Sequence, residues 1–471
     1  MTRVARLILA YVSLLAVASA NDGSKVLALS IDYKDQIYLG YDRGVVFGKE
    51  EIAELLRTAR RSGFDEIYWC VSAVGKVTYP SKVMTVMDGT GLRSPNYSPA
   101  GVVLKQIDPL AVAIRVAHDL GMRVFVYITL FDFAYPGLES RFFQDHPEYW
   151  SRLAGVTADN VTEALPGTAE ALEFSKSVST GGDSKLLSVA EREGSAPYVR
   201  GVPSYGYPAV RNHVLEQVKE LINYRADGIY FDISRTHSGV YPVLAFGYYP
   251  QWKDPYLRYG YNEPEIARYR KLYGKNPPIR GVGQRTQPQS MDETEDEKKW
   301  NSVRGSFLTD FMREASRFVH DAGMKVAVGF YPESFNDFQP GTNVRQQMGR
   351  MEVAWGKWAE EGLIDIIRLK VEGGAHGLDD WRQSSGRRYA SVQRRGVRVY
   401  VDVSINGEFD KLIAPSTPLP ITYQESPAKY LRVLESITKG IMNSSADGAF
   451  VYEAQDTPQP IFDAIRLGAG R

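Results

Sequence analysis

The sequence predicts an α/β protein whose alternating strands and helices close into a single (β/α)8 TIM barrel. Three observations support this fold class. An amphipathic helical stretch repeatedly ends at a glycine and passes at once into a β-branched run, as at Gly63, Gly121, Gly323, Gly362 and Gly396. Eight short apolar runs can be counted in this way, and no G-x-G-x-x-G turn joins a strand to a helix. An open, doubly wound sheet would usually carry such a turn.

The glycine junction is informative because glycine readily adopts the left-handed conformation that ends a helix. The expected strands span residues 26–32, 66–72, 123–131, 228–232, 325–330, 365–370, 398–403 and 449–453. The expected helices span residues 49–61, 108–120, 211–224, 302–322, 344–361, 379–395, 427–439 and 461–467. In 302–322 the apolar residues keep helical spacing on one face, which is typical of a helix that covers a sheet.

The chain is much longer than a minimal barrel, which needs roughly 250 residues. The surplus of this 471-residue chain is concentrated in two insertions, at about 133–209 after the third strand and at about 234–301 after the fourth. Both follow the carboxyl ends of strands, where barrel enzymes carry their active sites. We therefore expect one catalytic domain, 21–471, with long loops around its active site.

The first 20 residues have the pattern of a secretory signal peptide. Arg3 and Arg6 precede an apolar stretch over 7–18, and Ala18-Ser19-Ala20 forms a small-x-small cleavage site. This order of a positive region, a short apolar region and small residues predicts export. No later stretch is apolar enough to span a bilayer. We expect a secreted or periplasmic bacterial protein that has no membrane anchor after signal cleavage.

Composition argues against several classes of partner and cofactor. Lysine plus arginine equals aspartate plus glutamate, at 56 each, so the chain lacks the basic field that nucleic acid binding usually requires. The single cysteine, Cys70, lies in an apolar run, where a thiol usually packs as a small hydrophobic group. The six histidines show no H-x-H or H-E-x-x-H spacing. We therefore expect no nucleic acid, no catalytic metal and no cofactor.

Acidic residues recur at the carboxyl ends of the expected strands. Hydrolysis of a glycosidic bond needs two carboxyl groups, one to protonate the leaving oxygen and one to attack or to activate water. Asp232 is the first candidate, as nucleophile or base, because it ends the apolar strand Ile229-Tyr230-Phe231 and polar residues follow it. Aspartates at strand ends also cap helices, and that reading stays open for each acid taken alone.

Two glutamates are candidates for the proton donor. Glu333 follows the fifth strand closely, and Glu453 ends the eighth. Glu453 lies five residues past Gly448, whereas Asp232 lies four residues past Gly228, so the two acids are not expected to point inward in one register. In Asn262-Glu263-Pro264 we expect Asn262 to cap a helix, rather than Glu263 to act as the acid.

Other residues at the strand ends are candidates for binding substrate. Arg235 and His237 are placed to bind hydroxyl groups or to keep Asp232 ionised. Aromatic residues are frequent in the expected loops, and their rings suit the apolar faces of sugars. The candidate substrate-binding residues are Asp32, Trp69, Asp132, Arg235, His237, Arg368, Lys370, Glu372 and Asp402.

Several segments of the chain resemble a known family, the glycoside-hydrolase-like family ten of exported bacterial barrels. The segments that carry the resemblance are 108–132, 146–150 (His-Pro-Glu-Tyr-Trp), 207–211 (Tyr-Pro-Ala-Val-Arg), 226–232, 259–273 and 300–309. The resemblance implies a barrel that hydrolyses polysaccharide, with the aspartate of the fourth strand as its main functional residue. The family commonly has two adjacent aspartates there, whereas Ile233 follows Asp232 here, so only Asp232 is carried over.

The sequence thus favours a secreted glycoside hydrolase that acts on O-glycosidic bonds of a poly- or oligosaccharide. Two other functions stay open. A non-catalytic carbohydrate-binding barrel would keep the aromatic residues and tolerate loss of Asp232. A polysaccharide lyase would need a base and a cation to neutralise a uronate, for which Arg235, Arg368 and Lys370 are available.

Overall fold

A computed structural model confirms the predicted barrel. It describes residues 25–73, 75–89, 95–133, 140–152, 198–234, 240–241, 246–247, 260–278, 294–330, 351–369, 390, 392–405, 423–424, 426–455 and 457–471. Parallel strands pair in the order β1-β13-β12-β11-β10-β7-β4-β2, and pairing of β1 with β2 closes the barrel. The strands are β1 (Val26–Asp32), β2 (Glu66–Ala73), β4 (Arg123–Thr129), β7 (Gly228–Asp232), β10 (Lys325–Phe330), β11 (Ile366–Leu369), β12 (Arg398–Ser404) and β13 (Gly448–Tyr452).

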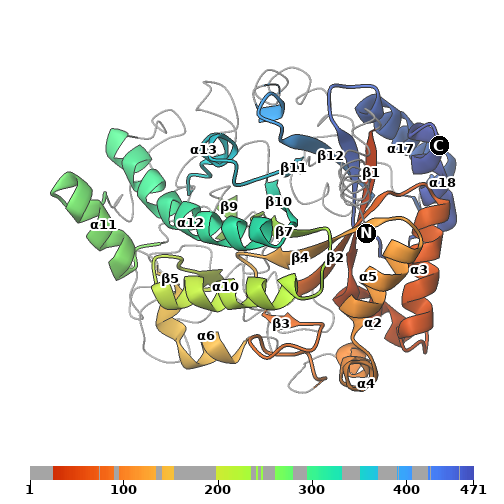
Figure 1. Ribbon diagram of the computed structural model, residues 1–471, viewed down its shortest axis with the longest axis horizontal. Helices are drawn as coiled ribbons and strands as arrows, with labels where there is room; N and C mark the ends of the chain where they lie inside the picture. Colours follow the sequence, from red (N-terminus) through yellow and green to blue (C-terminus); the bar gives the residue numbers. More distant parts are fainter. Residues whose placement is uncertain are drawn as a thin grey trace, which may run out of the picture.

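Helices surround the strands, with α10 and α12 on one side and α3, α5, α17 and α18 on the other (Figure 1). The covering helices are α3 (Lys49–Arg61), α5 (Pro109–Asp119), α10 (Pro208–Ile222), α12 (Glu295–Asp321), α13 (Trp355–Glu360), α17 (Pro427–Met442) and α18 (Gln459–Gly468). Among the described residues, no helix is long and apolar enough to cross a membrane. Of the expected helix 344–361, the described part is helical only in α13 (Trp355–Glu360), because 351–354 form no helix. Most of the expected helix 379–395 lies outside the described residues.

Helices α12 and α2 also differ from the sequence-based expectation. α12 begins at Glu295, seven residues before the expected start, because Thr294 and Glu297 form a capping box that satisfies the first N–H groups. A further helix, α2 (Tyr33–Asp42), follows β1 directly, and Asp32 is its N-cap. Asp32 therefore has a structural role in addition to any role at the strand end.

The described parts of the two insertions contact each other, and the first also contacts the end of β4, where the Tyr205 hydroxyl donates to the Leu130 carbonyl at 3.0 Å. β5 (Trp150–Arg152) pairs antiparallel with β6 (Tyr198–Pro203) in the first insertion. In the second, α11 (Glu263–Tyr273) has Asn262 as its N-cap residue. The Asn262 side chain makes no cap bond, however, and instead hydrogen-bonds to the Arg152 N–H and the Trp150 carbonyl. Asn262 thus joins the two insertions.

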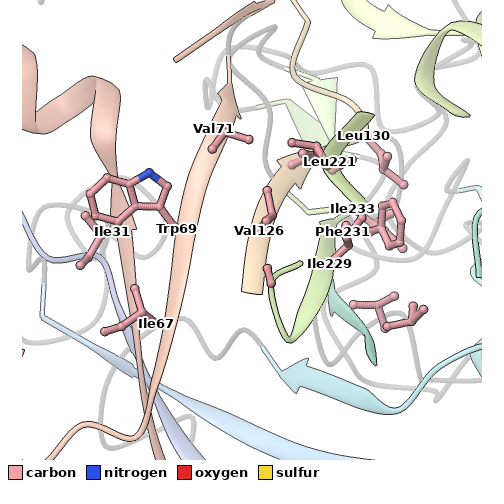
Figure 2. Close-up of a cluster of buried hydrophobic side chains, with 14 of the residues drawn as sticks. Ile31, Ile67, Trp69, Val71, Val126, Leu130, Leu221, Ile229, Phe231 and Ile233 are labelled. Atoms are coloured by element: carbon pink, nitrogen blue, oxygen red, sulfur yellow. The ribbon is translucent and has the colours of Figure 1, made fainter. Parts of the chain in front are cut away.

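The core has an inner part inside the barrel and an outer part between barrel and helices. Aromatic rings fill the inner part, where Tyr68 and Phe125 stack with centroids 4.7 Å apart. The outer part is mostly aliphatic, and Figure 2 shows side chains of β2, β4 and β7 that belong to it. Alternate residues of one strand serve the two parts, as the two-residue period of a strand requires.

A buried carboxylate occupies the amino-terminal end of the barrel. Glu66 accepts hydrogen bonds from the Tyr68 and Tyr400 hydroxyls at 3.2 and 3.1 Å and pairs with Arg123. Burial raises the pKa of Glu66 although Arg123 and Arg398 act in the opposite direction. The barrel interior is therefore filled at this end, and a ligand site belongs at the other.

An aspartate precedes every second strand and binds the strand before it. In each case a carboxylate oxygen accepts a backbone N–H at 2.8–3.0 Å. The four pairs are Asp65 with Leu27, Asp227 with Val124, Asp365 with Val326 and Asp447 with Val399. This repeat ties neighbouring strands together at the amino-terminal face, where barrel residues usually serve stability.

We expect Asp365→Asn to lower the free energy of unfolding by about 2 kcal/mol near neutral pH. Burial favours the neutral acid, but hydrogen bonds from His320, Val326 and Lys325 outweigh it and hold the pKa of Asp365 at about 2. A lowered pKa stabilises the fold above the unfolded value of 3.8, and this contribution is lost as the pH falls through about 2. Urea unfolding at neutral and acidic pH measures the effect.

The exposed Asp119 on α5 provides the matched control. Asp119→Asn should leave the free energy of unfolding within about 0.5 kcal/mol of wild type at both pH values. If Asp365→Asn unfolds like Asp119→Asn near neutral pH, the carboxylate at this strand end does not stabilise the barrel.

Candidate functional site

Polar side chains replace the aromatic rings at the carboxyl end of the barrel interior. Asp232 ends β7 on the face that also carries Tyr230, because residues two apart on a strand share a face. Tyr127 of β4, Arg368 of β11 and Asp402 of β12 reach the same group. The structure thus brings together three residues that the sequence singled out, namely Asp232, Arg368 and Asp402.

Asp232 is buried and held by donors on both carboxylate oxygens. Its Oδ1 accepts the Ser234 backbone N–H at 2.8 Å and the Ser234 hydroxyl at 2.6 Å. Its Oδ2 accepts the Tyr127 hydroxyl at 2.6 Å and lies 3.6 Å from Arg368 Nη1. Donors and a nearby cation favour the ionised form of a carboxyl group, so this environment is suited to a fixed anion.

Arg368 is a fully buried cation at the centre of the group. Its Nε and Nη2 both donate to Asp402 at 2.7 Å, and its Nη1 donates to the Tyr230 hydroxyl at 2.9 Å. The guanidinium also lies over the rings of Phe450 and Tyr452, at 4.3 and 4.4 Å from their centroids. Burial acts to lower the pKa of Arg368, but Asp402 and its other partners raise it overall, so the side chain stays charged.

Gly329 of β10 makes this arrangement possible. It lies between the two charges, because its register partners are Asp232 on β7 and Arg368 on β11. The hydroxyl of Tyr230 occupies the space where a side chain would stand, only 1.8 Å from a Cβ built on Gly329. Glycine therefore lets Tyr230 reach Arg368 across the middle strand.

We expect Gly329→Ala to lower the free energy of unfolding by about 3 kcal/mol, because the added methyl group must displace the buried Tyr230 ring. Gly356→Ala on α13 is the control, since a Cβ there meets nothing within 4 Å; it should be neutral or slightly stabilising. Thermal unfolding of the two variants measures the difference. A Gly329→Ala protein as stable as Gly356→Ala would contradict the packing described here.

A second polar group lies where β1 and β13 end. One oxygen from each of Asp32, Asp35 and Glu453 lies within 4.8 Å of the others. Gln455 Nε2 donates to Asp35 at 2.6 Å and to Glu453 at 3.1 Å. Three carboxylates could hold a hard cation, but the Lys34 ammonium already pairs with Asp35 and lies 3.7 Å from Asp32. The group is therefore arranged as an ion-pair network.

The remaining predicted site residues fall in three places. Asp132 is buried just past β4, and its backbone carbonyl accepts the Thr129 hydroxyl. Trp69 lies on the outer face of β2 (Figure 2), and its ring stacks on Tyr33 with centroids 5.4 Å apart. The structure thus places Trp69 in the outer core, away from the groups inside the barrel. Predicted residues outside the described part of the chain are Arg235, His237, Glu333, Lys370 and Glu372.

Sequence reasoning missed Tyr127, Tyr230 and Asp35, whereas Ser234 is one of the polar residues expected to act on Asp232. Tyr230 could have been found, since it precedes Asp232 by two residues and must share its face. Tyr127 depends on the pairing of β4 with β7, in which it is the partner of Tyr230. That register is a long-range property, and no local motif signals it.

No family model and no curated protein matches the chain, so the resemblance to glycoside-hydrolase-like family ten stays a prediction. Among solved structures, the chain is similar to the glycoside hydrolase domain of PgaB (BpsB) from Bordetella bronchiseptica, with 14% identity over 94% of this chain and 98% of that one and a TM-score of 0.48.

Two further solved structures are similar to the chain at lower identity. A β-galactosidase from the psychrophilic Marinomonas ef1 has 11% identity and a TM-score of 0.49, over 94% of this chain and 59% of that one. A class V chitinase from Pseudomonas fluorescens Pf-5 has 9% identity and a TM-score of 0.40, over 94% and 99%. The assignment of the barrel itself rests on the strand order and register given above.

Proposed function

We propose that the protein is a glycoside hydrolase that cleaves O-glycosidic bonds of a poly- or oligosaccharide by a two-carboxylate mechanism. The observation that supports this most directly is the environment of Asp232. A carboxylate at the carboxyl end of a barrel strand is oriented by Tyr127 and Ser234 and lies beside the Arg368 cation. A positioned anion of this kind suits a nucleophile, or a base that activates water.

The proposed proton donor is Glu453, in a contrasting environment. Asp32 and Asp35 lie beside it, and Gln455 Nε2 donates to its carboxyl group at 3.1 Å. Glu453 is buried directly after β13, so it can supply the second carboxyl group that a two-carboxylate mechanism needs. Glu333 is the alternative acid. It lies outside the described residues.

One observation weakens the lyase alternative. Neutralising a uronate carboxylate requires a cation that is free to bind it, whereas Arg368 already donates two hydrogen bonds to Asp402 and a third to the Tyr230 hydroxyl. The other cations proposed for that role, Arg235 and Lys370, lie outside the described residues. Hydrolysis by two carboxyl groups needs no cation bound to the substrate. In that mechanism Arg368 acts on Asp232, which lies 3.6 Å from its Nη1.

The proposed setting is the periplasm or the outside of a bacterial cell, following the signal-peptide pattern of residues 1–20. The mechanism proposed here uses side chains alone and needs no cofactor. A carbohydrate is the proposed partner.

The test is incubation of the purified protein with a panel of bacterial, algal and plant polysaccharides, with two readouts. Hydrolysis would release reducing ends without a new ultraviolet-absorbing product, whereas a lyase would release an unsaturated product that absorbs in the ultraviolet. Saccharide binding without either product would replace the proposal with a binding barrel.

A further inference from the structure

A buried glutamate lies where the two insertions meet. Glu265, in the first turn of α11, is only 4% exposed. Its Oε1 accepts the Ser204 hydroxyl, which belongs to the connection between β6 and α10. Its Oε2 is buried and has no hydrogen-bond partner in the described part of the chain. Glu265 therefore differs from Asp232, whose two carboxylate oxygens both accept hydrogen bonds.

Gly206 lets the Glu265 carboxyl group pack directly against the backbone of the first insertion. A Cβ built on Gly206 would lie 2.5 Å from Oε2 and 2.7 Å from Oε1. The Ser204 hydroxyl, nearby backbone N–H groups and Arg304 all favour the ionised carboxylate, but burial outweighs them and raises the pKa of Glu265 to about 7. The group formed by Glu265, Ser204 and Gly206 thus contains a carboxyl group that changes charge near neutral pH.

This group is close to the carboxyl end of the barrel. Tyr205 lies between Ser204 and Gly206, and its hydroxyl donates to the Leu130 carbonyl just past β4 at 3.0 Å. The Leu130 N–H in turn donates to the Asp232 carbonyl at 3.0 Å. The contact between the insertions is therefore built on a segment that is hydrogen-bonded to the end of the barrel at Asp232.

We infer that Glu265 is a protonation-dependent joint between the two insertions, in which the neutral carboxyl group holds 204–206 against α11 and its ionisation favours their separation. An ionised carboxylate in the packed joint has a buried Oε2 that no described donor stabilises, whereas separation lets water hydrate it. The inference goes beyond the proposed function and does not depend on it.

The sign of the pH dependence follows from the two states of Glu265. The separated, hydrated carboxyl group has the ordinary pKa of 4.5, whereas the packed group has a pKa of about 7. The packed form binds the proton more tightly, so its stabilisation is fully present below 4.5 and is lost as the pH rises through about 7. The equilibrium constant for separation should therefore rise by about tenfold between pH 6 and pH 8.

Every element around the joint carries other charged or titratable groups. They are Arg304 of α12, Arg211 and His213 of α10, Tyr205 and Tyr207 of the connection, His146, Glu148 and Arg152 in and beside β5, and Glu263, Arg268 and Tyr269 of α11 itself. Burial lowers the pKa of His213 to about 4, below the pH range that matters here. Histidines commonly titrate within that range, so His146 needs a control variant of its own.

The experiment is amide hydrogen exchange at pH 6, 7 and 8, with each rate divided by the intrinsic rate at the same pH to give a protection factor. The reporters are the N–H groups of Ser204 and Tyr261, which donate to the Tyr149 and Arg152 carbonyls at 2.8 and 3.0 Å. Their protection in wild type should fall by about tenfold from pH 6 to pH 8. They should also be less protected than the amides of β7, because the joint separates without unfolding the barrel.

Four variants identify the group that titrates. Glu265→Gln keeps an acceptor for Ser204 but cannot ionise, so the protection of both reporters should not change with pH. Glu263→Gln, an exposed carboxyl group in the same helical turn, and His146→Gln are the controls and should keep the wild-type fall. Ser204→Ala removes a donor that lowers the pKa of Glu265, so the fall between pH 6 and pH 8 should be larger than in wild type.

Constant protection in wild type, reporters as protected as β7, or a fall that persists in Glu265→Gln would overturn the joint. If Glu265→Gln does not fold, the comparison of Ser204→Ala with wild type decides, because a fall no larger than that of wild type would exclude Glu265 as the titrating group. None of these readouts requires substrate, so a failure here is separate from a failure to find glycosidase activity.

Discussion

Replacing Asp232 with asparagine is expected to lower kcat by at least about a thousandfold, with little change in the fold. The substitution keeps the shape of the side chain but removes its charge. It also turns one oxygen, which accepts from either Tyr127 or Ser234, into an N–H donor that faces another donor. Loss of the anion removes the nucleophile or base, and the amide cannot replace it.

The control for this variant is Asp119→Asn, an identical chemical change at an exposed helix position. It should leave kcat, KM and the melting temperature unchanged. Near-wild-type turnover by a folded Asp232→Asn protein would show that the reaction does not depend on the Asp232 carboxylate.

Replacing Glu453 with glutamine is expected to lower kcat on a natural polysaccharide by about a hundredfold to ten-thousandfold, because the leaving oxygen is no longer protonated. The same variant should keep most of its activity on an aryl glycoside whose leaving group departs without a proton. The measurement is kcat for both substrates, in wild type and variant. This substrate dependence distinguishes an acid from a residue that only supports the fold, since a folding defect would lower both rates equally.

Glu216→Gln, an exposed change on α10, serves as the control and should leave both rates unchanged. Equal losses on the two substrates would remove Glu453 from the role of acid. The same pair of substrates then tests Glu333, the other candidate.

The barrel could be predicted from the sequence because its signals are local. A glycine that ends a helix next to a β-branched run identifies a helix–strand junction, and Gly323 and Gly396 both have the expected positive φ, at 75° and 82°. The early start of α12 is also encoded locally, in the capping-box spacing of Thr294 and Glu297. α2 was missed because the end of β1 passes into it without a glycine or a loop.

The site could be predicted only in part, because contacts between strands depend on register. Asp232 stands out in sequence, as an acid at the end of a dry strand. Its link to Arg368 does not, since the two residues are separated by a whole strand and meet only because Gly329 leaves space between them. The sequence makes Arg368 a candidate for binding substrate but does not show its position inside the barrel, where it donates to Asp402.

The most direct test of the central claim compares wild type with Asp232→Asn on the panel of polysaccharides, with reducing-end release and saccharide binding measured together. The account predicts release by wild type, loss of release in the variant, and binding that survives in both. Release that persists in the variant, or binding without release by either protein, would contradict a glycosidase centred on Asp232.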